Sequence, residues 1–232
     1  MKPPTARIGS RRYVAELRDA FAEHADPESA FRMKFYLKGH FEFFGIKTPL
    51  RRVISKEFIG KRGIPHIDYT EELAHKLFDE EERELHHFSI ELMPYYRDSW
   101  TESYCDLFES MAVRKSWWDS VDSIRSLCLH EFFLRFPEQS ETVTAGWLDS
   151  GNLWLQRLAV TFQIGFRKRT DTKLLAKNID AVSDSDEFFI QKAIGWALRD
   201  YGKTDPGFVE RFVLERNLKP LSEKEALRRL KI

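Results

Sequence analysis

The chain has 232 residues, 42% of them hydrophobic and 32% charged, a balance typical of a folded globular protein rather than a disordered one. Its 37 Lys and Arg residues equal its 37 Asp and Glu residues, so the net charge by itself argues against a nucleic-acid-binding protein. No run of about 18 apolar residues could span a membrane, and the N-terminus lacks the apolar segment of a secretory signal.

Apolar residues recur at intervals of three and four in nearly every segment, which predicts α-helices throughout. No alternating strand pattern is convincing. In chain order, the clearest helical stretches are 13–24, 71–93, 103–113, 123–136, 153–166 and 188–202.

Helix start signals accompany several of these stretches. Thr48, before a proline, and Ser116, three residues before Asp119, are predicted N-caps, the second in the form of a capping box. Asn152 and Asp186 are predicted to cap the two later helices.

The segments also repeat. Residues 152–160 align with residues 187–195 at a shift of 35, and the same shift relates five polar residues, each inside a predicted helix: Arg52, His87, Asp122, Arg157 and Lys192. This period fits paired-helix repeats, and no TPR or ankyrin consensus is present. We therefore predict an all-α fold: a right-handed α-solenoid of HEAT-like helical repeats with a concave, partly basic groove. It is expected to form a single domain over residues 1–232, with residues 1–10 flexible.

Charge is segregated along the chain. Residues 32–62 hold nine Lys and Arg against Glu42 and Glu57, whereas residues 68–109 hold thirteen Asp and Glu against three basic residues. This pattern predicts one positive and one negative surface. For the acidic run around residues 79–84, the alternative is an ordinary solvated helix face.

The stretch 116–124 places two tryptophans beside two aspartates. On a helix that starts near Trp117, Trp118 and Asp122 share a face, while Trp117 points toward the core. Capping explains Asp119, but Asp122 lies beyond the first turn, where a carboxylate no longer helps the helix start. The alternative is a surface carboxylate paired locally with Arg125.

One tryptophan and three cations form a stripe on the last of these helices: Lys192, Trp196, Arg199 and Lys203. If the repeats stack in register, the faces carrying Asp122 and Arg157 are neighbours and this stripe comes next. A carboxylate between tryptophan faces, rimmed by cations, suits a cationic, phosphate-linked substrate. The alternative is a basic helix face with one half-buried tryptophan.

The segment 45–52 supplies a second candidate site. Backbone amides after Thr48, at the positive end of a helix, form an anion site with Arg51 and Arg52 nearby. The alternative is an ordinary, well-capped helix.

Motifs for metal or cofactor chemistry are absent from the sequence. It contains no HExxH, HxH, Cys/His cluster, P-loop, GxSxG, or GxGxxG after a strand, so neither a metal nor a cofactor is expected. The chain contains only two cysteines, Cys105 and Cys128, so no disulfide framework is expected and a reducing, cytoplasmic location is favoured.

The sequence resembles the AlkD family of DNA alkylation-repair glycosylases, which are built from HEAT-like helical repeats. The resemblance covers most of the chain. It rests on four motifs in order: MKFYLKGHFEFFGIKTPLRR (33–52), SWWDSVD (116–122), WLQRLAV (154–160) and FFIQKAIGWALRDYGKTDP (188–206).

The resemblance implies a role for each matched residue. It implies a catalytic carboxylate at Asp122, sugar-facing tryptophans at Trp118 and Trp196, and an arginine near the lesion phosphate at Arg157. It also implies DNA contacts at four further positions: Tyr36, Thr48, Arg52 and Arg199.

The sequence departs from the family pattern near one of these contacts, and it offers three further cations. Leu37 and Gly39 stand where many relatives carry Met and Asn, a departure that affects local DNA contacts but not the catalytic group. Arg51, Lys192 and Lys203 complete the predicted DNA-binding set, and Lys192 is interpreted as a phosphate contact rather than a Schiff-base amine.

The predicted protein is a monofunctional DNA glycosylase that hydrolyses the N-glycosidic bond of cationic alkylated purines in duplex DNA during base excision repair. N3-methyladenine and N7-methylguanine are the expected substrate types. The expected partner is double-stranded DNA containing alkylated bases. The protein is expected to be a cytoplasmic monomer without membrane contact, associated with the nucleoid if it is bacterial. Two alternatives stay open: a non-catalytic HEAT-like DNA-binding protein for damaged or branched DNA, and a protein-binding helical scaffold.

Overall fold

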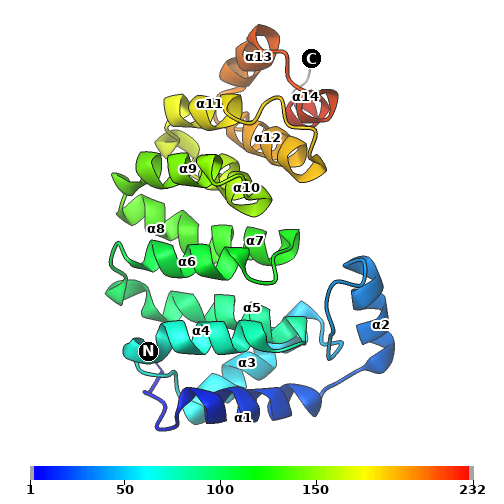
Figure 1. The fold of residues 1–232 in the computed structure, drawn as a ribbon, viewed down its shortest axis with the longest axis vertical. Coiled ribbons are helices and arrows are strands. Elements are labelled where there is room, and N and C mark those ends of the chain that lie inside the picture. The colour runs from blue at the N-terminus through cyan, green and yellow to red at the C-terminus, as the bar shows by residue number, and fades with distance from the viewer. Residues whose placement is uncertain (1–2, 230–232) are drawn as a thin grey trace. The chain divides into compact units, whose positions relative to one another are not determined.

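The computed structural model describes residues 3–229 (Figure 1). Within that range the regular structure is helical, and β-pairing is limited to two isolated bridges. The predicted all-α class is therefore confirmed. The chain divides into two compact units, Met1–Thr101 and Glu102–Ile232, and a single domain over residues 1–232 stays a prediction.

The first unit is held together by helices that pack on their neighbours. Its helices are α1 (Ser10–Ala22), α2 (Pro27–Tyr36), α3 (Thr48–Arg62), α4 (Thr70–Asp79) and α5 (Arg83–Leu92), with 3₁₀ segments at Ile67–Tyr69 and Met93–Ser99. Helix α1 packs on α3 and α4, and α4 packs on α5. Edge-to-face ring pairs fill the core, with Phe58 5.0 Å from Tyr13 and 6.3 Å from Phe88 between ring centroids.

The predicted single helix over residues 71–93 is wrong, because residues 80–82 separate α4 from α5. Arg18 of α1 donates hydrogen bonds to Glu80 and Glu82, each at 2.6 Å. Both carboxylates flank an extended backbone that a continuous helix could not adopt. A tertiary ion pair therefore interrupts a stretch whose periodicity alone favours one helix.

Glu84 is buried, so the acidic run is not a single solvated face. Its carboxylate accepts backbone N–H bonds from Phe44, Gly45 and Ile46 at 3.2, 2.9 and 3.0 Å. Burial raises the pKa of Glu84, while these bonds oppose the shift. At Gly45, where φ is +92°, a Cβ atom would lie 2.1 Å from the carbonyl oxygen of Asp26. The bonds and the tight turn fix the loop that leads into α3.

The start of the chain contacts the first unit. The Ala6 N–H donates to the Ile64 carbonyl at 2.7 Å, and the Ile64 N–H donates to the Pro4 carbonyl at 2.8 Å. Residues 4–6 are thus paired in the structure, and residues 1–2 lie outside the described range. The flexibility of the segment 1–10 stays a prediction.

The second unit continues the pattern of packed helices. Its helices are α6 (Tyr104–Val113), α7 (Trp118–Ile124), a π-helical turn (Arg125–Leu129), α8 (His130–Arg135), α9 (Gln139–Asp149), α10 (Leu153–Thr161), α11 (Thr172–Asp180), α12 (Phe188–Tyr201), α13 (Pro206–Glu215) and α14 (Pro220–Leu227), with a 3₁₀ turn at Arg167–Arg169. Helix α10 packs on α6, α7, α9 and α12, and α12 packs on α14. This arrangement agrees with the predicted α-solenoid, whereas its handedness and a concave groove stay predictions.

Of the predicted N-caps, Asn152 is confirmed, because its side chain accepts the N–H groups of Trp154 and Leu155 at 2.9 and 3.2 Å. Asp186 is wrong: α12 is preceded by Glu187 as its N-cap. The Asp186 carboxylate instead accepts a hydrogen bond from Lys219 at 2.8 Å.

The other two predicted N-caps are displaced by one residue. The N-cap of α7 is Trp117, in extended conformation and without a side-chain cap bond, so Ser116 does not start the predicted capping box. The N-cap of α3 is Lys47, which makes Thr48 the first helical residue. In both places a neighbour with extended backbone takes the position, so the helix start forms without the predicted hydroxyl.

Candidate functional site

Asp122 and Arg157 form a two-point ion pair between α7 and α10. Arg157 Nε donates to Asp122 Oδ1 and Nη2 donates to Oδ2, both at 2.9 Å, the parallel geometry that fixes a carboxylate most firmly. Arg157 Nη1 also donates to the Phe189 carbonyl at 2.8 Å. The Arg157 side chain is 6% exposed and that of Asp122 20% exposed, so the carboxylate reaches solvent and its partner does not.

The repeat of 35 residues accounts for this pairing. Asp122 and Arg157 occupy equivalent positions in helices that pack on each other, as the predicted register requires. The alternative in which Asp122 pairs with Arg125 is wrong: Asp122 is hydrogen-bonded to Arg157, and the Arg125 guanidinium donates to the Ile164 carbonyl instead.

Trp196 of α12 lies beside two guanidinium groups. The Cζ atom of Arg125 is 5.0 Å, and that of Arg157 5.8 Å, from the centroid of its ring. The indole is thereby joined to the Asp122–Arg157 pair, and the structure brings Asp122, Arg157 and Trp196 together as the sequence predicts.

Arg125 is the residue of this cluster that sequence reasoning assigned only as a local partner for Asp122. It is buried, and Nη1 donates to the Ile164 carbonyl at 3.3 Å. Burial lowers the pKa of Arg125, and the charges of Asp122 and Asp200 oppose that shift. The π-helical turn that starts at Arg125 is a local signal that only the structure reveals.

Trp118 and Trp117 have different roles. Trp118 begins α7, so it lies one helical turn before Asp122 on the same face, as predicted. Trp117 packs against Trp154 and Phe189 with ring centroids 5.6 and 5.3 Å apart. Since Phe189 also accepts the hydrogen bond from Arg157, this aromatic cluster braces the ion pair.

The three cations of the predicted stripe all carry carboxylate partners, and Lys203 lies beyond the end of α12 at Tyr201. Lys192 and Arg199 both donate to Glu225 of α14, Lys192 at 2.9 Å. Lys203 donates to Asp200, which also accepts the Gly165 N–H at 2.7 Å. The stripe is therefore a set of partly neutralised cations, and sequence reasoning missed both carboxylates.

The predicted DNA-contacting residues of the first unit differ in exposure. Tyr36 and Thr48 are exposed. Arg51 is buried and Arg52 is exposed, and both donate to the same oxygen of Glu91, at 2.9 and 2.8 Å. Arg52 is therefore the more accessible candidate, and the DNA-binding role of all four stays a prediction.

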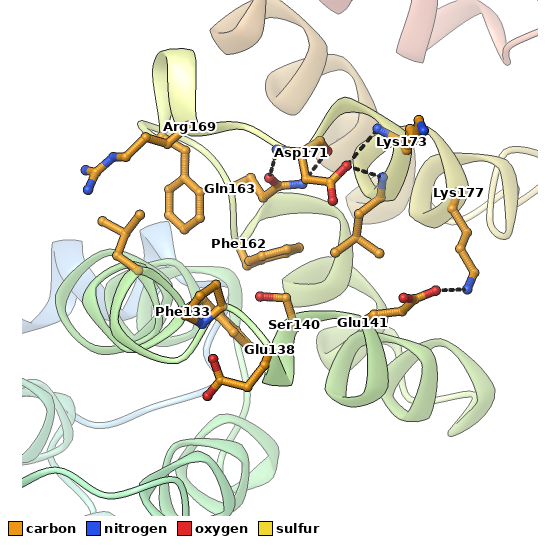
Figure 2. Close-up of a pocket in the computed structure, with 14 residues that line it drawn as sticks. Phe133, Glu138, Ser140, Glu141, Phe162, Gln163, Arg169, Asp171, Lys173 and Lys177 are labelled. Atoms are coloured by element: carbon orange, nitrogen blue, oxygen red, sulfur yellow. Dashed lines mark hydrogen bonds and ion pairs between the residues drawn. The ribbon is translucent and has the colours of Figure 1, made fainter.

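A pocket of about 660 Å³ lies elsewhere in the second unit (Figure 2). Phe133 and Phe162 line it together with charged side chains such as Arg169. Two hydrogen bonds join Gln163 and Asp171, both of which line the pocket (Figure 2). The Asp171 N–H donates to Gln163 Oε1 at 2.7 Å, and Gln163 Nε2 donates to the Asp171 carbonyl at 3.0 Å. No predicted site residue lines this pocket, so it is separate from the Asp122 cluster.

Residues 3–229 contain neither a metal-binding cluster nor a membrane-spanning helix. In that range no three His, Cys, Asp or Glu side chains are grouped so as to hold a metal ion. Over the same residues, no helix has the length and apolar character needed to cross a membrane. Cys105 and Cys128 are both free and buried, and burial raises the pKa of Cys105 to about 12.

Comparisons with known proteins cover nearly the whole chain. The model of a family described as DNA alkylation repair enzyme matches residues 17–230, a range that contains every predicted site residue. A solved structure, that of a predicted DNA alkylation repair enzyme from Enterococcus faecalis, is similar at 31% identity over 89% of this chain and 97% of its own, with a TM-score of 0.83. No curated protein matches.

Proposed function

The chain belongs to the DNA alkylation repair enzyme family, and we propose that it is a monofunctional DNA glycosylase acting on cationic alkylated purines in duplex DNA. N3-methyladenine and N7-methylguanine types are the proposed substrates, and base excision repair is the proposed process. The proposal starts from a role in alkylation repair, which membership in the family supports. The glycosylase reaction is the further step, supported by the chemistry of the Asp122 cluster.

The substrate chemistry needs little from the protein. Alkylation at N3 or N7 gives the purine a positive charge, so the base leaves as a neutral molecule when the C1′–N9 bond breaks, and no general acid is required. Positive charge then develops on the deoxyribose, as in other glycoside cleavages. Water adds its oxygen to C1′ and releases one proton, which leaves an abasic sugar. What a catalyst must supply is a fixed negative charge near that sugar.

The observation that carries the proposal is the orientation of Asp122. Two parallel hydrogen bonds from a buried guanidinium hold its carboxylate while 20% of the side chain stays exposed. A preorganised carboxylate of this kind stabilises developing positive charge without reorganising during the reaction. In the same position it accepts a hydrogen bond from the attacking water. Arg157 then acts chiefly by positioning Asp122.

The surroundings of Asp122 supply the remaining functions. Trp118 and Trp196 are proposed to face the sugar. Lys192 and its neighbours are proposed to contact phosphates. The Asp122 cluster, the predicted stripe and their carboxylate partners together carry five positive and three negative side chains: Arg125, Arg157, Lys192, Arg199 and Lys203 against Asp122, Asp200 and Glu225. Such a local excess supports salt-dependent DNA binding in a chain whose net charge is zero.

Base release from a duplex containing N7-methylguanine tests the proposal. The wild-type protein should release the free base, and Asp122→Asn should lower the single-turnover rate by about 100-fold or more, since it removes the charge and keeps the shape. Asp149→Asn is the matched control, because Asp149 is exposed at the end of α9 and should leave the rate unchanged. Equal rates for Asp122→Asn and the wild type would contradict the role of Asp122.

The same duplex, used in a binding measurement beside the base-release assay, separates the alternatives. A wild-type protein that binds the duplex but releases no base is the non-catalytic DNA-binding protein. One that does not bind duplex DNA supports the protein-binding scaffold.

A further inference from the structure

Glu225 on α14 is a buried carboxylate that holds two cations predicted to contact DNA. Lys192 Nζ donates to its Oε1 at 2.9 Å, and Arg199 Nη1 donates to its Oε2. Arg199 Nη1 also donates to the backbone carbonyl of Glu225 at 3.2 Å. The carboxylate side chain is 11% exposed, so one nearly buried anion restrains both cations.

The close approach of α12 and α14 fixes the position of Glu225. A Cβ atom at Gly195 would lie 2.3 Å from the Glu225 Cβ and 2.9 Å from the Ser222 carbonyl oxygen, so only glycine allows this contact. Ser222 and Ala226, on either side of Glu225, are fully buried. The Glu225 backbone is therefore held close to α12, which keeps its carboxylate within reach of both cations.

The two cations lie on either side of Trp196, four residues before it and three residues after it, and thus on one face of α12. Hydrogen bonds from Lys192 and Arg199 lower the pKa of Glu225 against the effect of burial, which leaves it ionised at neutral pH. An ammonium has three N–H donors and a guanidinium has five, so both cations keep donor capacity beyond Glu225.

We propose that Glu225 is a selectivity residue for DNA binding. It restrains Lys192 and Arg199, so that these two cations contribute little to the binding of undamaged DNA. The inference rests on the proposed function. A phosphate that approaches either cation must share it with Glu225 or displace it, and the two anions repel each other. DNA gains these contacts only when its phosphates fit the fixed donors.

The competing explanation is an ordinary ion pair that joins two helices. Such a pair would affect stability, and its removal would change DNA binding only by the loss of one distant negative charge. The two explanations therefore differ in the affinity for undamaged duplex and in its dependence on salt.

The experiment compares Glu225→Gln with Glu223→Gln. Both changes remove one negative charge from α14, but Glu223 is exposed and lies two residues away, so the two side chains point in different directions. Binding of each variant to an undamaged duplex is measured by fluorescence anisotropy over a range of salt concentrations. Thermal unfolding establishes that both variants are folded.

Glu225→Gln should bind the undamaged duplex on the order of three- to tenfold more tightly at about 100 mM salt. The slope of log K against log salt should become steeper by about 1 to 2, because one or two additional phosphate contacts form. Glu223→Gln should stay within about twofold of the wild type. The gain should disappear when Lys192→Gln and Arg199→Gln are added to Glu225→Gln.

A second variant keeps the test independent of folding in Glu225→Gln. With Glu225 in place, Lys192→Gln should change the salt slope for undamaged DNA by well under 1, whereas an unrestrained phosphate contact would change it by about 1. Equal affinity and slope for Glu225→Gln and Glu223→Gln would overturn the inference, as would a full-size slope change in Lys192→Gln.

Failure of the proposed function has a different signature. A wild-type protein that binds duplex DNA without releasing base overturns the glycosylase reaction, and the comparison of Glu225→Gln with Glu223→Gln still decides the inference. A wild-type protein that does not bind duplex DNA overturns both.

Discussion

Replacing Arg157 with lysine keeps a positive charge beside Asp122 but removes the two-point fork. Arg157 makes three hydrogen bonds at 2.8–2.9 Å from a nearly buried position, two to Asp122 and one to the Phe189 carbonyl. The point-like ammonium of lysine can reproduce about one of them. Two buried hydrogen bonds at about 1–1.5 kcal/mol each predict a loss of about 2–3 kcal/mol in the free energy of unfolding.

The chain contains a matched control for this change. Arg216 forms a pair of the same geometry with Asp180, with Nε to Oδ1 at 2.7 Å and Nη2 to Oδ2 at 3.1 Å, but its side chains are 31% and 46% exposed rather than 6% and 20%. Exposed pairs contribute about 0–1 kcal/mol, so Arg216→Lys should change stability by less than about 1 kcal/mol.

Urea denaturation monitored by circular dichroism gives the free energy of unfolding of both variants, and thermal unfolding gives their Tm. For a chain of this size, the Arg157→Lys loss corresponds to a decrease of roughly 4–12 °C in Tm. Arg157→Lys should also slow base release, because Asp122 loses its fixed orientation, whereas Arg216→Lys should not. Equal destabilisation by the two substitutions would refute the reasoning from burial, and unchanged base release in Arg157→Lys would refute the positioning role.

Two further predictions concern α12 and α14. Gly195→Ala should destabilise the protein by about 1–3 kcal/mol, because the new Cβ atom meets Glu225. Gly146→Ala in α9 has open space around it and should stabilise the protein by about 0.5–1 kcal/mol. A stabilised Gly195→Ala in urea denaturation would contradict the close approach of α12 and α14. The lowered pKa of Glu225 makes its contribution to stability present above the ordinary value of about 4.5 and lost as pH falls through the lowered value. Glu225→Gln should therefore lose less stability than the wild type as the pH falls below about 4.5, and identical acid unfolding curves would argue against that shift.

Local sequence patterns predicted the helical class and part of the candidate site. The spacing of 35 residues placed Asp122 and Arg157 in equivalent helices, and they are bonded in the structure. This prediction was possible because residues one repeat length apart occupy equivalent positions in adjacent, packed repeats. The hydrogen-bonding side chain of Asn152 likewise acts within its own turn, which is why its cap could be predicted.

What the sequence did not reveal depends on distant residues. Arg18 divides the predicted helix over residues 71–93 from more than 60 positions away. Helix α14 lacks a clear apolar stripe, so neither the helix nor Glu225 was predicted. Arg125 was assigned to Asp122 because the two are close in sequence, whereas its ring contact with Trp196 comes from another helix.

The two guanidinium groups beside Trp196 limit what that ring can do for a cationic sugar. An indole attracts a cation through the negative charge of its face, and Arg125 and Arg157 already draw on that charge. A third positive centre would gain less from the ring and would be repelled by both arginines. Trp196 is then better suited to form a wall of the site than to stabilise the positive charge of the sugar. Most of the electrostatic stabilisation must then come from the Asp122 carboxylate. Substitution of Trp196 by another large, flat side chain should accordingly be tolerated far better than any neutral replacement of Asp122.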